Sequence, residues 1–400
     1  MTFAPLRAVP WRGGSFILYL SMLTGLTALS VDMSLPALPH LATEFQSDPL
    51  HVQATLSLFL LGYGFSHLVY GALSDQFGRR PVLLGGIGLF TIASLGCALS
   101  PSLNSLILLR LIEGIGACCG PVLARAVVRD SFEGHEAARA LSTITVALGL
   151  APLLAPLMGG ALVTYLNWRT IFLFLATVGA LAFALTWMRF GETNHELRPG
   201  ALSPVRWLEA LVAIAHHRDC RRAALRVCFV YGGMLAYIGG SPGILIVQMG
   251  ASEMAFGLYF GIGGIFMMIG ATCNRLLIHR LGKVVMGRVG SILALIGGFS
   301  MVGAALLLPA TPLTVVLPMA AFIFAVGMIL PNASAEMLAP FPSMAGTVSS
   351  MMGGLQVLCG SLATAVIAHF QAGGALSLGL TLSVCALFVF AAQPKRAAKP

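Results

Sequence analysis

The chain has 400 residues, of which 58% are hydrophobic and only 9% are charged, and its mean hydropathy is +0.91. Soluble domains are about one quarter charged, so this composition excludes a chain of water-soluble domains. The net charge of +9 is divided among separate loops, which argues against a nucleic-acid site. We therefore predict a helical protein that crosses a membrane many times.

A spanning helix takes about 20 mainly apolar residues, and roughly twelve stretches of the chain meet that requirement. The predicted spans are 15–36, 51–72, 82–100, 103–126, 140–163, 168–189, 222–247, 254–275, 285–308, 312–332, 344–367 and 374–392. The fold class is thus an all-α membrane protein with about six spans on each side of its middle.

The loops between these spans differ in charge. Basic residues gather in every second loop, at Arg7, Arg12, Arg79, Arg80, Arg129, Arg139, the run Arg189–Arg226, Arg275, Arg280, Lys283, Arg288, Lys395, Arg396 and Lys399. The opposite loops hold Arg169 together with the acids Glu44, Asp48 and Glu253. Because cytoplasmic loops carry the excess of Lys and Arg, both termini are predicted to lie in the cytoplasm.

The first span contains an acid, Asp32, in the segment TALSVDMSLPALPHL. A carboxylate at the centre of a membrane helix costs roughly 2.5–3.5 kcal/mol, so such a residue is a candidate for function. Removal from water favours the protonated form, which allows the group to bind and release a proton. The alternative is that Asp32 lies near the outer end of its helix and reaches interfacial water, because Pro36 and Pro39 follow closely.

The loop after the second span reads GALSDQFGRRPVL over residues 71–83. It places Asp75, Arg79 and Arg80 between two apolar spans. Gly71 and Gly78 permit a close approach and a tight turn. The arginines alone would serve as a topology signal, but the acid and the glycines are not needed for that purpose.

The fourth and fifth spans carry further candidates. Arg110 and Glu113 are three residues apart, so they share a helix face and can pair, either as a proton-handling group or as a structural ion pair. Arg129 and Asp130 end the fourth span and are candidate partners for Asp75. In the fifth span, the proline and glycine pairs predict a bend and a close helix approach at Pro152, Pro156, Gly159 and Gly160.

The long polar stretch from Gly191 to Arg222 lies near the middle of the chain. Ser203 and Pro204 predict the start of a helix whose apolar face lies on the cytoplasmic membrane surface, although a solvated linker is the alternative. The predicted organisation is therefore a first helical bundle (1–190), a linker with an interfacial helix (191–221) and a second bundle (222–400).

Other chemistry is not indicated. The eight cysteines form no C-x-x-C pair and no metal-ligand spacing with histidine, so they are interpreted as small apolar residues. The chain has no GxxxxGK[ST] motif, so no ATP site, cofactor or metal is expected. The expected partners are a small-molecule substrate, protons and the lipid bilayer, without nucleic acid, for a monomer that is not an enzyme.

The loop pattern G-x-L-x-D-x-x-G-R-[RK]-x-x-L resembles the loop between helices 2 and 3 in the major facilitator superfamily. The resemblance implies twelve helices in two pseudo-symmetric bundles of six, and a gate cluster around Asp75 that stabilises one of two alternating conformations. The segment Cys273–Lys283 is a weak echo of the loop in the second half, with Gly282 aligned to Gly78 and His279 in place of the acid.

Three further segments resemble motifs of the superfamily's antiporters. The D-M-x-L-P-A-L-P segment at Asp32 is similar to the Bcr/CflA drug–proton antiporters, in which this acid is thought to bind protons or substrate. The R-x-x-[QE]-G-x-G segment at Arg110 resembles the helix-4 antiporter motif, whose arginine is linked to proton movement, although Glu113 stands where the family commonly has Gln. Helix 5 resembles the glycine–proline antiporter motif only partly, because Ala155 replaces a glycine.

The resemblance implies proton-coupled export of small drug-like molecules, with antibiotic efflux as the leading case, in the cytoplasmic membrane of a bacterium. The alternative is a proton-coupled carrier of a metabolite such as a sugar, nucleoside or amino acid. A membrane sensor or lipid-handling protein on the same fold is a more distant alternative.

Overall fold

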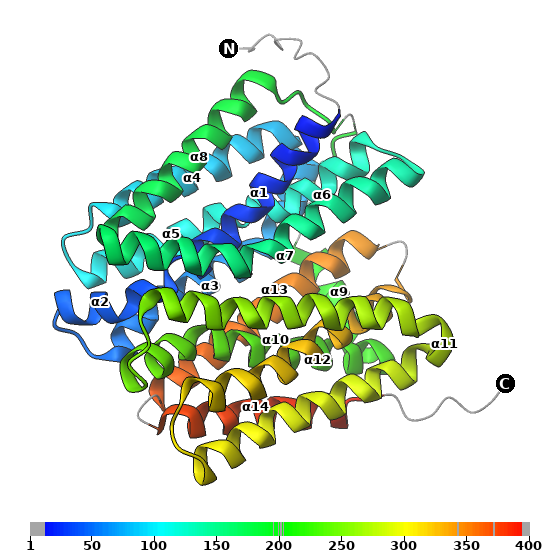
Figure 1. Ribbon diagram of the computed structural model, residues 1–400. Coiled ribbons are helices and arrows are strands. Elements are labelled where there is room, and N and C mark those ends of the chain that lie inside the picture. The colour runs from blue at the N-terminus through cyan, green and yellow to red at the C-terminus, as the bar shows by residue number, and fades with distance from the viewer. Residues whose placement is uncertain are drawn as a thin grey trace.

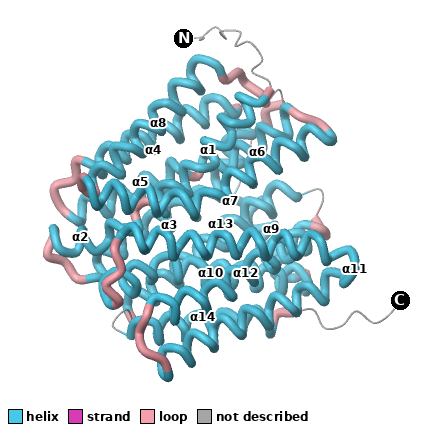
Figure 2. Tube along the Cα trace, viewed as in Figure 1, coloured by secondary structure: helices cyan, strands magenta, loops and turns pink. Residues whose placement is uncertain are grey.

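A computed structural model of the protein describes residues 13–194, 196–198, 200, 202, 204–341, 344–370 and 373–393. Every regular element in these ranges is a helix, as Figure 2 shows, which agrees with the predicted all-α class. The helices of the first half are α1 (Gly14–Asp32), the short η1 (Leu35–Ala37), α2 (Leu38–Glu44), α3 (Pro49–Phe77), α4 (Arg79–Ala98), α5 (Leu103–Ala117), α6 (Cys119–Ser131), α7 (Gly134–Tyr165) and α8 (Arg169–Arg189).

The helices of the remaining chain follow after the polar stretch. They are α9 (Pro204–His216), α10 (Arg218–Pro242), the π-helical turn η2 (Gly243–Gln248), α11 (Glu253–Leu307), α12 (Pro312–Leu338), α13 (Ala345–His369) and α14 (Gly374–Ala391). Side chains cap several N-termini, and Asp48 accepts a hydrogen bond from the backbone N–H of His51 at 2.7 Å at the start of α3.

Helix α11 contains two predicted spans rather than one. It runs for 55 residues, which at about 1.5 Å per residue is far longer than a bilayer is thick. Its interior is interrupted at Gly282, where φ is 78° and ψ is 161°. Eleven helical segments in the described ranges are long and apolar enough to span a membrane, and the two arms of α11 raise the number of crossings to the predicted twelve.

Two spans differ in detail from the prediction. The first does not end near residue 36, because η1 and α2 extend it to Glu44. The predicted span 103–126 consists of α5 and α6, which meet at Cys118. Helices with interior prolines, such as α7 with Pro152 and Pro156, continue through them, since one missing hydrogen bond bends a long helix without ending it.

Helices α1–α8 and α10–α14 form two groups that lie one above the other in Figure 1. The seam between the groups is formed where α3 packs on α13 and α7 packs on α11. Glycines permit the close approach: a Cβ added at Gly257 of α11 would lie 3.0 Å from the backbone of Leu157 in α7. We call the end of the bundle with α2 and the start of α11 the outer end, and the end with the α3–α4 turn the inner end.

The helix predicted within the linker is present as α9, while the proposed cap Ser203 lies outside the described residues. Ile214 of α9 is buried in a small apolar cluster with Cys220, Met337 and Val348. Apolar side chains on the other side of α9 are exposed, including Leu208, which is 61% exposed. This exposed face is compatible with a helix on a membrane surface, which stays a prediction, as does the division at residues 190 and 221.

Candidate functional site

The turn between α3 and α4 brings the predicted loop residues together at the inner end. Arg79 donates from Nη1 to Asp75 Oδ1 at 2.6 Å and to Ser74 Oγ at 2.6 Å. Its Nε donates to Asp130 Oδ2 at 2.8 Å, although the guanidinium side chain is only 4% exposed. Arg79 therefore connects the end of α3 to the end of α6. Asp75 and Asp130, which were predicted to be partners, are linked because both bind this arginine.

Two other arginines of the predicted gate lie at its edge. Arg129 has a side chain that is 67% exposed and stands 3.9 Å from Asp130, so its contact is weak. Arg80 points away from Asp75 and donates to the carbonyl oxygen of Trp187 at 2.9 Å. Only Arg79 is the central cation of this group.

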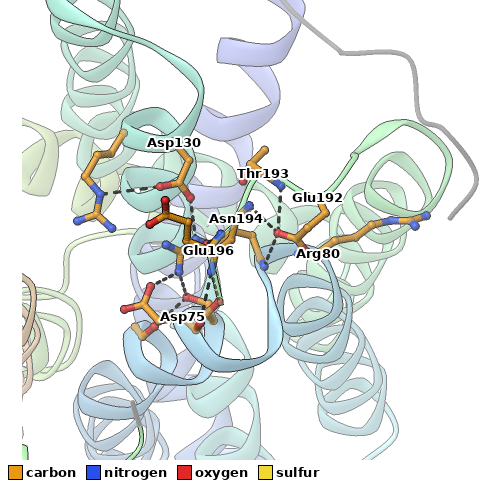
Figure 3. A network of polar contacts seen from close by, with 11 residues as sticks. Asp75, Arg80, Asp130, Glu192, Thr193, Asn194 and Glu196 are labelled. Atoms are coloured by element: carbon orange, nitrogen blue, oxygen red, sulfur yellow. Dashed lines mark hydrogen bonds and ion pairs between the residues drawn. The ribbon is translucent and has the colours of Figure 1, made fainter. Parts of the chain in front are cut away.

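Sequence reasoning missed Glu192, which holds the start of α4. Its carboxylate accepts the backbone N–H groups of Arg79 at 2.8 Å and Arg80 at 3.0 Å, so it supplies the cap that a helix N-terminus requires. The same carboxylate accepts the N–H groups of Thr193 and Asn194 at 3.0 and 2.9 Å. Figure 3 shows this group of contacts beside Asp75 and Asp130.

The segment after α8 is also fixed to the end of α3. The side-chain amide of Asn194 donates to the carbonyl oxygens of Ser74 and Asp75 at 3.3 and 3.4 Å. The backbone N–H of Arg198 donates to the carbonyl oxygen of Asp75 at 2.9 Å. The first part of the linker is thus part of the inner cluster, and no motif spacing in the sequence signals it.

Gly78 is required at the turn for two reasons. Its φ is 97° with ψ of 158°, a conformation that side chains rarely adopt, and a Cβ there would collide with the Glu192 carboxylate. Gly282 between the two arms of α11 has nearly the same conformation, with φ of 78° and ψ of 161°. The sequence alignment of Gly282 with Gly78 therefore has a structural counterpart.

Arg110 and Glu113 form a fully buried pair, with Arg110 Nη1 2.8 Å from Glu113 Oε2 and side chains that are 1% and 0% exposed. Glu113 also accepts hydrogen bonds from Ser30 Oγ at 2.9 Å and Ser94 Oγ at 3.0 Å. The Arg110 guanidinium lies 4.3 Å above the ring of Phe59. The predicted pairing is present, and its partners tie α1, α3 and α4 to α5.

Asp32 is different from the other buried charges. Its residue is only 5% exposed, and it lies twelve residues before the end of α2, away from the outer rim. Among the described residues its carboxylate has no hydrogen-bonding or ion-pair partner. Tyr231 and Tyr237 of α10 are close enough to be affected by its charge, which places Asp32 on the side of α1 that faces the second group of helices.

The four helix-5 residues lie in the outer half of α7, where Pro152 and Gly160 face α11 across the seam and Gly159 faces the first span. A Cβ added at Gly159 would collide with the backbone of Met33. One added at Gly160 would lie 2.7 Å from the carbonyl oxygen of Glu253. A Cβ added at Gly264 would lie 3.1 Å from Pro152. This segment, which continues through Pro156, packs α7 against the first span and against α11; it does not contact the inner cluster.

Two charged groups were not singled out from the sequence. Arg226 of α10 is buried and pairs with Glu336 of α12, but in the sequence it reads as the end of the basic run before it. Arg125 of α6 is exposed, its charge lies near enough to Tyr63 of α3 and Tyr231 of α10 to affect both, and it has no ion-pair partner in the described ranges. In the sequence it lies five residues before Asp130, so it could not be distinguished from the basic residues of the inner end.

The sequence of residues 20–364 matches the profile described as Major Facilitator Superfamily. The chain belongs to the major facilitator superfamily. It is 33% identical over 355 residues to an uncharacterized MFS-type transporter, YdgK, of Bacillus subtilis, with 87% of each chain covered. It is 28% identical to the bicyclomycin resistance protein homolog of Haemophilus influenzae, covering 92% of this chain and 93% of that protein.

A further relative in the superfamily is multidrug resistance protein D of Escherichia coli, which is 29% identical over 94% of both chains. Among solved structures, a D-xylose–proton symporter superposes with a TM-score of 0.71 at 18% identity, covering 96% of this chain and 98% of that one. At that identity the likeness shows the fold alone. It agrees with the twelve crossings. Membership of the superfamily, with relatives that are transporters, identifies the chain as a transporter and not an enzyme.

The Glu192 cap can be tested by the substitution Glu192→Ala. Loss of an N-terminal cap costs about 0.5–2 kcal/mol, so the first turn of α4 is expected to exchange its amide hydrogens several-fold faster. Glu196→Ala on the same segment is the matched control, because the structure gives the Glu196 carboxylate no partner among the described residues. Equal exchange in the Glu192→Ala variant and the parent would contradict the assignment.

The Arg110–Glu113 pair predicts a large loss of stability on Glu113→Ala. The variant leaves a buried guanidinium without its carboxylate, which costs about 3–5 kcal/mol. Thermal unfolding in detergent should show this loss, whereas Asp32→Asn, which breaks no contact, should unfold close to the parent. A Glu113→Ala protein as stable as the parent would show that the pair is not structural.

Proposed function

We propose that the chain exports small drug-like molecules in exchange for protons, by alternating access between the two groups of helices. Relatives that span nearly the whole chain are named for bicyclomycin resistance and multidrug resistance. A third, of which 83% is covered at 31% identity, is a chloramphenicol resistance protein of Pseudomonas aeruginosa. The observation within this chain that carries the proposal is the unpaired carboxylate of Asp32.

Asp32 is proposed as the proton-binding group. Five charged side chains of the described residues are buried: Asp32, Arg79, Arg110, Glu113 and Arg226. The other four are held in ion pairs, so their charge states are fixed by their partners. Protonation of a carboxylate without a partner breaks no ion pair. Such a group can therefore take up and release a proton without disrupting its surroundings, as a proton-coupled carrier requires.

Arg110 and Glu113 are proposed as a support for this site. Ser30 donates to Glu113 while Arg110 donates to the hydroxyls of Ser30 and Ser34, on either side of Asp32 in the chain. The pair therefore fixes the backbone of α1 and η1 at the position of Asp32. In this role it acts through α1 instead of taking part in proton transfer itself.

Coupling follows when substrate and proton bias the same equilibrium. If the outward-facing form binds protons better and the inward-facing form binds substrate better, each ligand displaces the other across the membrane. The inner cluster of Asp75, Arg79, Asp130 and Glu192 is proposed to stabilise one of the two forms. The moving units are proposed to be residues 1–190 and 222–400, joined by the linker 191–221.

The proposed setting is the cytoplasmic membrane of a bacterium, with both termini on the cytoplasmic side and a monomeric transporter. The inner cluster would then face the cytoplasm. The small-molecule cargo would approach from there or from the bilayer, and protons would approach from the outer end.

The function predicts that substrate addition collapses an inside-acid proton gradient in inverted vesicles. Chloramphenicol-type, bicyclic and cationic compounds would be added in turn, and at least one should release protons from parent vesicles. Asp32→Asn should abolish this response, because an amide cannot carry the proton, while the protein still inserts and unfolds like the parent. Full coupled export by the Asp32→Asn variant would remove Asp32 from the mechanism.

The metabolite carrier remains the alternative function, favoured by Ala155 in place of the helix-5 motif glycine. The same vesicles distinguish the two functions. No response to any drug, together with a response to a sugar, nucleoside or amino acid, would replace drug export with metabolite transport.

A further inference from the structure

The two groups of helices are joined at the outer end by a polar contact between His40 and Glu253, which is an ion pair when the imidazole is protonated. His40 Nε2 of α2 lies 2.8 Å from Glu253 Oε1, on the first residue of α11. The side chains are 46% and 22% exposed, so water and protons reach them directly. The pair connects the end of the first span to the start of the eighth, which belong to different groups.

The backbone around this pair is closely packed. A Cβ added at Gly160 of α7 would lie 2.7 Å from the carbonyl oxygen of Glu253, and one at Gly159 would collide with Met33 at the end of α1. Helix α2 also packs against η2 of the second group. Outward opening must separate these elements, and the His40–Glu253 contact cannot survive that separation.

The neighbouring charged groups of the outer end are occupied within the first group. Glu44, one turn after His40 on α2, accepts from Trp168 Nε1 and from Arg169 Nη1, both at 2.6 Å. Among the elements that pack on α2, η1 and η2 contribute no titratable side chain, and α3 contributes Asp48 and His51.

Asp48 and His51 both have partners within the first group of helices. Asp48 caps the helix by accepting the His51 N–H at 2.7 Å, and His51 Nε2 contacts Asn104 Oδ1 at 2.8 Å. Glu253 is therefore the carboxylate that faces His40 in the described structure. His51 is a second histidine on the same face that does not bridge the two groups.

We propose that His40 is an outer proton-binding latch, which closes the outer end of the transporter when the solution there is acidic. Histidine changes charge between about pH 5 and 8, and only the imidazolium form makes an ion pair with a carboxylate. Protonation of His40 thus favours the closed outer end, and deprotonation favours its opening. The latch depends only on the positions of His40 and Glu253 on the two groups of helices. It does not depend on which cargo is carried.

The latch lets the pH of the outer solution influence the opening of the outer end. Asp32 cannot do this once the outer end has closed, because the outer solution then no longer reaches it. Acid on the outer side closes the end through which a proton has just entered. An exposed ion pair shifts such an equilibrium only by about two- to fivefold, so the latch adjusts the dwell time of the open form without locking it.

Hydrogen–deuterium exchange in nanodiscs tests the latch without reference to transport. Segments 35–48 and 249–260 would be followed at about pH 5.5 and about pH 8, after correction for the intrinsic exchange rates. The parent should show about two- to fivefold stronger protection of both segments at the acidic pH. His40→Gln should remove this difference, and His40→Lys should retain strong protection at both pH values.

The matched control is His51→Gln, which removes a histidine from the same face and should leave the pH difference intact. The exchanged pair, His40→Glu with Glu253→His, should restore the difference that either single substitution removes. An absence of pH-dependent protection in the parent, or its persistence in His40→Gln, would overturn the proposal. Since no cargo is present, these outcomes are independent of whether the protein exports drugs.

Discussion

Hydrocarbon does not solvate charge, and this constraint organises the interior of the protein. Arg110 and Glu113 are both inaccessible to water and would each be strongly destabilising alone, so the pair must form together with its hydroxyl donors. In forming, it gathers α1, α3 and α4 around α5. Arg79 with its two aspartates does the same for the inner ends of α3 and α6. Asp32 is the exception: the other buried charged side chains of the described residues are held in ion pairs, and its carboxylate is not.

The seam between the two groups is built on a different principle. Glycines are frequent along it and leave room for the opposite helix: Gly160 faces the backbone of Glu253, whereas Gly353 and Gly354 of α13 face the side chains of His67 and Leu68 of α3. Charged contacts lie mostly within one group: Arg79, Arg110 and Arg226 all pair inside their own half. Each half is therefore held together by its own charged contacts, while the two halves meet mainly through close helix packing, which suits a motion of one half against the other. The linker is held at both ends, by Asn194 in the first group and by Ile214 in the second.

The sequence was sufficient for what depends on hydropathy and on local spacing. It predicted the spans, the pairing of Arg110 with Glu113 three residues on, and the turn at Gly78, because each is determined by neighbouring residues. It could not predict the Glu192 cap, whose partners lie 112 and 113 positions away, or the contact of His40 with Glu253.

Proton release on substrate binding to the purified transporter tests the central claim most directly. In weakly buffered detergent solution, a substrate that occupies the interior should displace about one proton from the parent protein, because both ligands compete for opposite conformations. The Asp32→Asn protein should bind the substrate without releasing a proton. Equal release from both proteins, or binding to the parent without any release, would contradict the assignment of Asp32 as the group that couples proton to cargo.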